Sequence, residues 1–265
     1  MPFFRNFPKT NYDFSQTGIS TKVTDIFRYV KPIDSYLDDI STYKWHLIDP
    51  GERPDQVSQK LYGTPIYYWT FFILNEHLRR GMACWPMGQQ EFDEYLATEY
   101  EGVTINSRPE IIRNSDGAIT EYRNSIADRF EVGEPVLGIQ SGATGKIIAR
   151  NIDLSQLVIE NVTGKFRENE LIRGQFSLDE VTIYQVFDSV DAPHHYVDND
   201  GREVDNSLFI TGATFMNPDQ EAARTITNRE YEEEENESFR EIRVIKPGLI
   251  KKFAERYESL VNGVG

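Results

Sequence analysis

The sequence predicts an α+β protein. Its parts are a small module with a two-stranded sheet and two helices, an inserted β-rich barrel or sandwich, an extended N-terminal arm and a C-terminal helix. Three observations support this fold class. A strand pattern followed by two capped helices lies within residues 41–100. A stretch rich in Gly, Val and Ile, with regularly spaced turn residues, fills residues 103–187. An apolar stripe at helical spacing lies near the end of the chain, within residues 188–265.

Residues 1–40 are expected to form the arm. Thr21–Val30 is the only part with a helical period, because Val23, Ile26, Phe27 and Val30 recur at that spacing. The remainder mixes aromatic residues with prolines and polar residues, so it cannot build a core of its own. We therefore expect it to pack along other surfaces, with these aromatic residues as partner contacts: Phe3, Phe4, Phe7, Tyr12 and Phe14.

Residues 41–100 are expected to form the small module. In its first strand Tyr43, Trp45 and Leu47 alternate with polar residues, which predicts that these three side chains face the core. Pro54 suits the first position of a helix, and Gly63 suits the left-handed residue that ends it.

The second helix of the module contains the apolar run Ile66–Leu74, which begins just after Thr64 and Pro65. A membrane span needs roughly 20 apolar residues, and this run is much shorter. The aromatic side chains within it could stack on sugar rings, but a helix that is apolar all round is expected to be buried in a core.

Composition excludes several classes of function. The chain has 43 acidic and 28 basic residues and a formal charge of −15, so nucleic acid is not an expected partner. Cys84 is the one cysteine, which excludes an intrachain disulfide and a thiolate zinc cluster. The N-terminus has no unbroken apolar region typical of a secretory signal.

The inserted region and the residues after it contain several hairpin patterns. Asp116-Gly117 predicts a hairpin, and the glycine-rich stretch 138–149 lacks the residues of a phosphate-binding loop and is expected to be a turn between strands. Residues 194–205 predict another hairpin. The Glu-rich segment 230–241 is interpreted as a solvated helix face or as a dock for a basic partner. The terminal stripe predicts a last helix, in which Phe253 and Tyr257 are candidate partner contacts.

No pattern predicts catalysis or a cofactor. His194 and His195 are adjacent, so on a regular strand they would face opposite sides and could not bind one metal ion together. The hairpin near Gly201 lacks the acidic first and last residues of a calcium loop. We therefore expect neither an enzyme nor a metal protein.

The stretch from Tyr43 to Asn75 resembles a LysM module, whose pattern is a strand, a Gly-acid turn that opens a helix, and a second helix that ends in Asn. The matching core and turn residues are Trp45, Gly51, Glu52, Pro54, Leu61, Tyr62, Gly63, Trp69 and Asn75. The turn and the bulky second half differ from cell-wall LysM modules. They resemble the LysM-like segment of a baseplate wedge subunit of contractile-tailed (myovirus) phages.

The flanking segments, within residues 1–40 and 190–262, also resemble that wedge family, whereas residues 103–187 do not and are interpreted as an insertion. The resemblance implies a virion protein without catalysis, cofactor or membrane span, which assembles in the host cytoplasm. Its implied partners are other wedge subunits, the tail hub and sheath-initiating proteins, with several copies in a sixfold baseplate. The alternatives are a peptidoglycan-binding LysM-type module and, less favoured, a cell-wall hydrolase.

Overall fold

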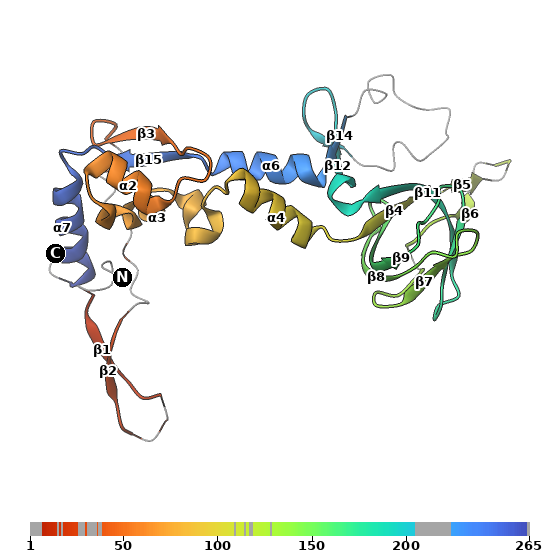
Figure 1. Ribbon diagram of the computed structural model, residues 1–265, viewed down its shortest axis with the longest axis horizontal. Coiled ribbons are helices and arrows are strands. Elements are labelled where there is room, and N and C mark those ends of the chain that lie inside the picture. The colour runs from red at the N-terminus through yellow and green to blue at the C-terminus, as the bar shows by residue number, and fades with distance from the viewer. Residues whose placement is uncertain are drawn as a thin grey trace. The chain divides into compact units, whose positions relative to one another are not determined.

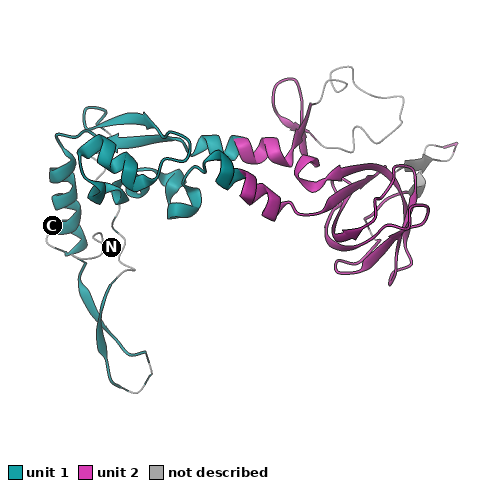
Figure 2. Cartoon of the chain, viewed as in Figure 1, with its two compact units in different colours: residues 1–92, 234–265 teal, residues 93–233 magenta. Residues whose placement is uncertain are grey.

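The computed structural model describes residues 7–14, 16, 18–25, 30, 36, 39–108, 110–113, 115–116, 119–127, 129–204 and 224–263. The chain divides into two compact units: unit 1 consists of residues 1–92 and 234–265, and unit 2 consists of residues 93–233 (Figure 2). The protein is therefore a mixed α and β structure in which unit 2 is inserted into unit 1 along the chain.

Unit 1 contains a two-stranded antiparallel sheet whose strands are far apart in sequence, β3 (Tyr43–Leu47) and β15 (Glu241–Ile245) (Figure 1). The first of these strands was predicted from sequence, but its pairing with a strand near the end of the chain was not. Trp45 lies opposite Arg243 in the register. The sheet is completed only after the chain returns from unit 2.

The helices between these strands begin and end near the predicted residues. Helix α2 (Pro54–Tyr62) has Pro54 in its first turn and ends at Gly63, which has a left-handed φ of 72°. The second predicted helix is split into a 3₁₀ turn, η2 (Pro65–Tyr67), and α3 (Trp69–Leu74). Two short 3₁₀ turns, η3 (Glu76–Leu78) and η4 (Gly81–Cys84), follow.

Unit 1 has two hydrophobic clusters, and α3 contributes to both. Phe71 packs with Trp85, Ile242 and Val244 in one cluster. Trp69 and Leu74 pack in the other, against α7 (Ile250–Val261). The predicted stripe of α7 is confirmed as buried at these residues: Ile250, Phe253, Ala254, Tyr257 and Val261. None of the helices in the part of the chain that the structure describes is long and apolar enough to cross a bilayer.

The arm forms a β-hairpin of β1 (Lys9–Tyr12) and β2 (Thr21–Thr24). The prediction of a helix from Thr21 is therefore wrong for these four residues. Three of the four are β-branched, which favours a strand. The four residues pair with Lys9–Tyr12 instead of continuing the helical period. Ile26 and Phe27, which belong to the same prediction, lie outside the described residues.

Unit 2 is built around a closed six-stranded barrel with the strand order β10-β11-β4-β9-β8-β7. The strands are β4 (Val103–Ser107), β7 (Pro135–Gly138), β8 (Thr144–Asn151), β9 (Gln156–Thr163), β10 (Leu171–Gly174) and β11 (Glu180–Asp188). All neighbours are antiparallel, and fully buried aliphatic side chains such as Ile147, Ile159 and Ile183 fill the interior. The expected barrel or sandwich is thus a barrel.

Smaller elements complete unit 2. The hairpin of β5 (Glu110–Arg113) and β6 (Ile119–Arg123) forms where Asp116-Gly117 predicted it. The turn η5 (Ser189–Asp191) leads to a three-stranded sheet of β13 (Glu203–Val204), β12 (Pro193–Val197) and β14 (Arg224–Thr227). Two helices, α4 (Gln89–Glu99) and α6 (Asn228–Ser238), contain the sequence boundaries between the units. The acidic α6 has no buried residue, as expected for a solvated helix face.

Candidate functional site

In unit 1, residues 85–88 contact the Gly51-Glu52 turn. Gly51 has a left-handed φ of 74°. The indole N–H of Trp85 donates a hydrogen bond of 2.7 Å to the carbonyl oxygen of Glu52. Gly88 lies so close to Gly51 that a Cβ on Gly88 would be 2.9 Å from the Gly51 Cα atom. The backbone of the turn is therefore occupied by contacts from residues 85–88.

Asn75 joins α3 to β15. Its side-chain amide is buried and donates to the carbonyl oxygens of Phe71, at 2.8 Å, and Arg243, at 3.0 Å. The backbone N–H of Arg243 donates back to Asn75 Oδ1 at 2.8 Å. The phenol of Tyr62 donates to the carbonyl oxygen of Ile245 at 3.0 Å, and burial raises the pKa of that phenol. Both side chains thus form hydrogen bonds with backbone groups of β15 that do not pair with β3.

The residues expected in the core of the small module have mixed positions. Trp69 is buried against Tyr257, with ring centroids 5.2 Å apart, and Leu61 and Tyr62 are partly buried. Trp45 is 52% exposed, so its expected place in the core is wrong. The two-stranded sheet turns Ile242 and Val244 to the core instead, and the side chains of Trp45 and Leu47 lie on its other face.

The aromatic residues expected to contact partners fall into two groups. Phe7, Phe253 and Tyr257 are buried within unit 1 itself, so we assign them to its core. Tyr12 and Phe14 are 55% and 71% exposed, and their rings meet edge to face with centroids 4.8 Å apart. Two further residues of this prediction, Phe3 and Phe4, lie outside the described residues.

The exposed face of β3 is a second apolar surface of unit 1. Leu47 is 57% exposed and lies two residues from Trp45. The guanidinium of Arg243 lies over the rings of Tyr43 and Trp45, at 5.7 Å and 5.4 Å from their centroids. The two rings also meet edge to face, with centroids 6.2 Å apart, so the cation and both rings stabilise one another on this surface.

The barrel of unit 2 contains an internal repeat that sequence inspection missed. Residues 130–141 and 166–177 share the pattern Phe-x-x-Gly/Asn-Glu-x-x-x-Gly-x-x-Ser. The equivalent residues Gly133 and Asn169 both have a positive φ, of 96° and 63°. Each donates its backbone N–H to an equivalent carbonyl of the neighbouring strand, that of Ile147 in β8 or of Ile183 in β11. The spaced phenylalanine, glutamate and glycine residues are the signal that could have revealed the repeat.

Each repeat inserts a buried glutamate into the loop of the other. Glu134 accepts hydrogen bonds from the backbone N–H groups of Phe176 and Ser177, and Glu170 accepts from the N–H and hydroxyl of Ser141. Burial opposes the charge of Glu170, but these bonds and one from the Arg167 N–H outweigh it and lower the pKa of this carboxyl. The carboxylates therefore have a structural role.

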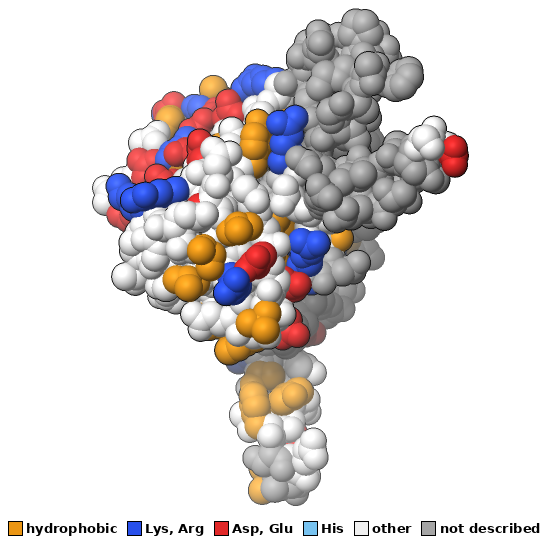
Figure 3. All heavy atoms as spheres, turned by 90° about the vertical axis from the view of Figure 1, so that its right-hand side faces the viewer, with side chains coloured by type: hydrophobic (Ala, Val, Ile, Leu, Met, Phe, Trp, Pro, Cys, Tyr) orange, Lys and Arg blue, Asp and Glu red, His pale blue; other side chains and the backbone are white. Residues whose placement is uncertain are grey.

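The surface of the barrel carries separate apolar side chains. Figure 3 shows one face of unit 2, on which hydrophobic side chains lie in small patches among charged ones. Val132, Phe176 and Leu178 are each at least 60% exposed. Scattered exposed residues of this kind are normal for a protein surface and do not by themselves indicate a binding site.

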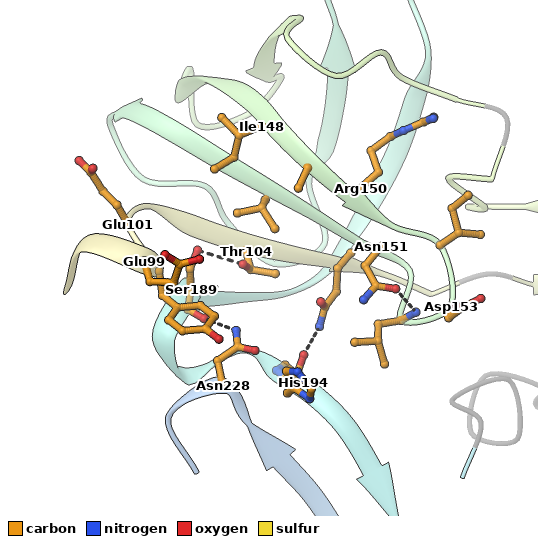
Figure 4. Close-up of a pocket in the computed structure, with 17 residues that line it drawn as sticks. Glu99, Glu101, Thr104, Ile148, Arg150, Asn151, Asp153, Ser189, His194 and Asn228 are labelled. Carbon is orange, nitrogen blue, oxygen red and sulfur yellow. Dashed lines mark hydrogen bonds between the residues drawn. The ribbon is translucent and has the colours of Figure 1, made fainter. Parts of the chain in front are cut away.

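Unit 2 has a cavity of about 810 Å³ between the barrel and the strand β12 (Figure 4). Some of its polar groups bind one another. The hydroxyls of Thr104 and Ser189 are 3.0 Å apart, and the Asn228 amide donates to the Ser189 carbonyl oxygen at 2.7 Å. The Gln156 amide donates to the Pro193 carbonyl oxygen at 2.9 Å. Ser189 thus has a hydroxyl partner and not a base, so the geometry does not favour nucleophilic catalysis.

His194 and His195 lie together beside this cavity, and the prediction that they face opposite sides is wrong. The register of β12 against β14 shifts between Pro193 and His195, and this irregularity breaks the alternation of side chains. The two Nδ1 atoms are 2.8 Å apart, and the His194 ring stacks on Tyr231 at 3.9 Å. Burial, followed by the neighbouring His195, lowers the pKa of His194.

The contact between the two histidines is a hydrogen bond, which requires one Nδ1 to be unprotonated. Among the described residues, no group of three or more His, Cys, Asp and Glu side chains is arranged to hold a metal ion. The pair therefore acts as part of the packing between β12 and α6.

Comparison with known proteins gives no family assignment. No protein-family model matches the chain, and no curated protein matches it either. The structure itself therefore has to indicate the function, and its exposed aromatic residues in unit 1 are the main indication.

Proposed function

We propose that the protein is a structural subunit that joins other proteins through exposed aromatic surfaces of unit 1. The observation that carries this proposal is the exposed face of β3, where Trp45 and Leu47 are both more than half exposed. Large aromatic side chains at the centre of an interface commonly dominate its binding energy. Tyr12 and Phe14 on the arm hairpin offer a second such surface.

The hairpin itself supports a role in association. Its strands β1 and β2 pair only with each other among the described elements, and no residue of β1 is buried. An isolated two-stranded hairpin is marginally stable in water, so it gains stability when a neighbour packs against it. Phe7 anchors the start of this hairpin in the core of unit 1.

The assembly that we propose is the baseplate of a contractile phage tail, with the protein as a wedge component that joins neighbouring wedges around the tail hub. The resemblance of residues 41–100 to the LysM-like segment of that family supports this assignment. So does the order of strand, Gly51-Glu52 turn, helix and Asn75 that unit 1 retains. In this proposal the protein resides in the virion and takes no part in catalysis.

Peptidoglycan binding by a LysM-type module is the alternative. Against it, the carbonyl of Glu52 is already bonded to Trp85 and the Gly51 backbone lies against Gly88. A glycan would have to displace these contacts to reach the backbone of the turn. Sedimentation with purified cell wall at physiological salt separates the two functions, because binding there would favour the glycan-binding alternative.

The role of the arm is tested by assembly of tail particles with the double variant Tyr12→Ser/Phe14→Ser. Removal of residues 1–20 would also delete the buried Phe7, so substitution of exposed residues is the cleaner change. We expect a folded protein that is not incorporated into baseplates. The matched control is Met82→Ser, which changes a residue of unit 1 that is 63% exposed. Normal incorporation of the double variant would contradict the role of the arm.

A further inference from the structure

The two outer edges of the β3–β15 sheet differ in their hydrogen bonding. On β15, both backbone polar groups of Arg243 bind Asn75, and the carbonyl of Ile245 binds Tyr62. The side chains of α2 and the residue after α3 therefore occupy the outer edge of β15. A further strand cannot pair there without displacing them.

The outer edge of β3 is open among the described residues. In an antiparallel pair, successive residues point their backbone groups alternately toward and away from the partner strand. Because Arg243 bonds outward to Asn75, the residue opposite it, Trp45, also points its N–H and C=O outward. Two flanking bonds fit this alternation: Lys246 N–H to the Thr42 carbonyl, and Ile48 N–H to the Arg240 carbonyl, both at 3.0 Å.

The alternation places the backbone N–H and C=O groups of Tyr43, Trp45 and Leu47 on this outer edge. In the described part of the chain, no hydrogen-bond partner is found for these groups. Unpaired groups in a row are a template for the addition of another strand. Two of these residues, Trp45 and Leu47, also carry exposed apolar side chains, and Tyr43 is partly exposed.

Arg243 indicates the charge that an added segment should carry. Its guanidinium contacts the rings of Tyr43 and Trp45, and no ion pair with a carboxylate is found for it among the described residues. A carboxylate from a partner could pair with it beside the exposed face. The apolar rings next to it would favour an apolar side chain at a neighbouring position of the same face.

We propose that the outer edge of β3 binds an extended segment of a partner polypeptide as a third antiparallel or parallel strand, with a carboxylate of that segment facing Arg243. This inference deepens the proposed function, because it names the surface and the chemistry of the partner. Backbone hydrogen bonds to Tyr43, Trp45 and Leu47 supply the affinity, and Trp45 and Arg243 supply the selectivity.

Amide hydrogen exchange of the free chain tests whether the edge is open. We expect the amides of Trp45 and Leu47 to exchange at least about a hundredfold faster than those of Lys44 and His46, which point toward β15. Equal protection of these amides would overturn the proposal. Protection of Trp45 that grows with protein concentration would also overturn it, since a second copy of the chain would then occupy the edge.

Binding is tested with an eight-residue peptide that alternates valine with threonine and carries one glutamate in the middle. We expect saturable protection of the Trp45 and Leu47 amides, with affinity about threefold weaker when lysine replaces the glutamate. A peptide with proline in place of a central valine should not bind, because it lacks a strand donor. Equal affinity for all three peptides, or no binding of the first, would contradict strand addition.

The matching protein variant is Trp45→Pro, which removes an outward N–H and leaves the inward bonds of Lys44 and His46 in place. We expect at least tenfold weaker peptide binding, whereas Lys44→Gln should change it less than twofold. Unchanged binding by Trp45→Pro would overturn the proposal, and the proline peptide gives the same test if this variant does not fold. The peptide tests do not depend on tail assembly, so their failure is distinguishable from failure of the proposed function.

Discussion

The side-chain amide of Asn75 is hydrogen-bonded in both directions to the backbone of Arg243, which lies 168 residues later in the sequence. The first part of unit 1 is thereby fixed to a strand that is made only after the whole of unit 2. The amide also binds the Phe71 carbonyl at the end of α3, so one side chain links helix and sheet.

Asn75→Ala should destabilise unit 1 by about 2 to 4 kcal/mol, because it leaves buried polar groups of Arg243 and Phe71 without partners. Urea unfolding followed by tryptophan fluorescence measures this loss. The three tryptophans are Trp45, Trp69 and Trp85, all in unit 1, so the signal does not report on unit 2.

The control for this variant is Asn262→Ala. Asn262 also donates to a carbonyl four residues earlier, but it is exposed at the end of α7. We expect it to change the free energy of unfolding by less than about 0.5 kcal/mol. Equal effects of the two substitutions would show that Asn75 does not hold β15 in place.

Trp69→Ala and Trp45→Ala should differ strongly in their effect on stability. Trp69 is 7% exposed and packs on α7, so its removal should cost about 3 to 5 kcal/mol. Trp45 is 52% exposed and mainly contacts Tyr43 and Arg243, so Trp45→Ala should cost less than about 1 kcal/mol. Thermal unfolding by circular dichroism compares both variants with the parent. A large loss for Trp45→Ala would contradict the exposed position of that residue.

Local sequence patterns predicted the elements of unit 1 well where a single residue type has one structural use. Helix α2 begins at Pro54 and ends at Gly63, as predicted. The missing N–H of proline suits the start of a helix, and the left-handed φ of glycine suits its end. For β3, the side chains of Trp45 and Leu47 were assigned to the wrong face of the sheet. Alternation shows which residues share a face, but it does not show which face packs against the helices. Only the register with β15 decides that Trp45 lies outside.

The histidine pair of unit 2 shows a different limit of sequence reasoning. The rule that adjacent residues of a strand face opposite sides holds for a regular strand, and β12 is irregular between Pro193 and His195. Pro193 cannot donate to a strand ladder and is compatible with a bulge, but also with the regular first residue of a strand, so it does not predict the irregularity. The reciprocal glutamates of the barrel, by contrast, could have been found from the repeated spacing of Phe130-Glu134 and Phe166-Glu170.

Glu170 should make the stability of the barrel depend on acid pH. The pKa of this carboxyl is lower in the folded protein than its ordinary value of 4.5, so the folded state favours its ionised form. Its contribution is therefore complete above about pH 4.5 and is lost as the pH falls through the lower, folded pKa. Amide exchange of Ile147 and Ile183 at pH 7 and in the acid range measures this change in unit 2.

Glu170→Gln should remove part of that pH dependence and destabilise the barrel at pH 7 by about 2 kcal/mol. An amide has one acceptor oxygen, whereas the carboxylate accepts from both Ser141 and Arg167. The matched control is Glu168→Gln, which changes an exposed residue nearby. A pH profile of Glu170→Gln parallel to that of the parent would contradict the assigned role.

Protonation of His194 in mild acid should weaken the packing of β12. Burial and the adjacent His195 lower the pKa of His194, while Glu232 and Glu203 partly oppose this effect. The unfolded chain then binds more protons than the folded one below the ordinary pKa of 6.5. Stability is therefore expected to fall as the pH drops from about 6.5 toward the lower pKa of the folded state. Protonation of His194 would also add a positive charge beside the His195 ring, where the two Nδ1 atoms are 2.8 Å apart.

His194→Gln tests this dependence. We expect the protection of amides in β12 and β14 to decrease between pH 7.5 and 5.5 in the parent and to decrease less in the variant. The pKa values of His46 and His77 are also lowered, in each case chiefly by burial, but both residues lie in unit 1 and are present in both proteins. Their effect cancels in the comparison, so equal pH dependence of the two proteins would mean that the His194–His195 contact does not control the packing of β12.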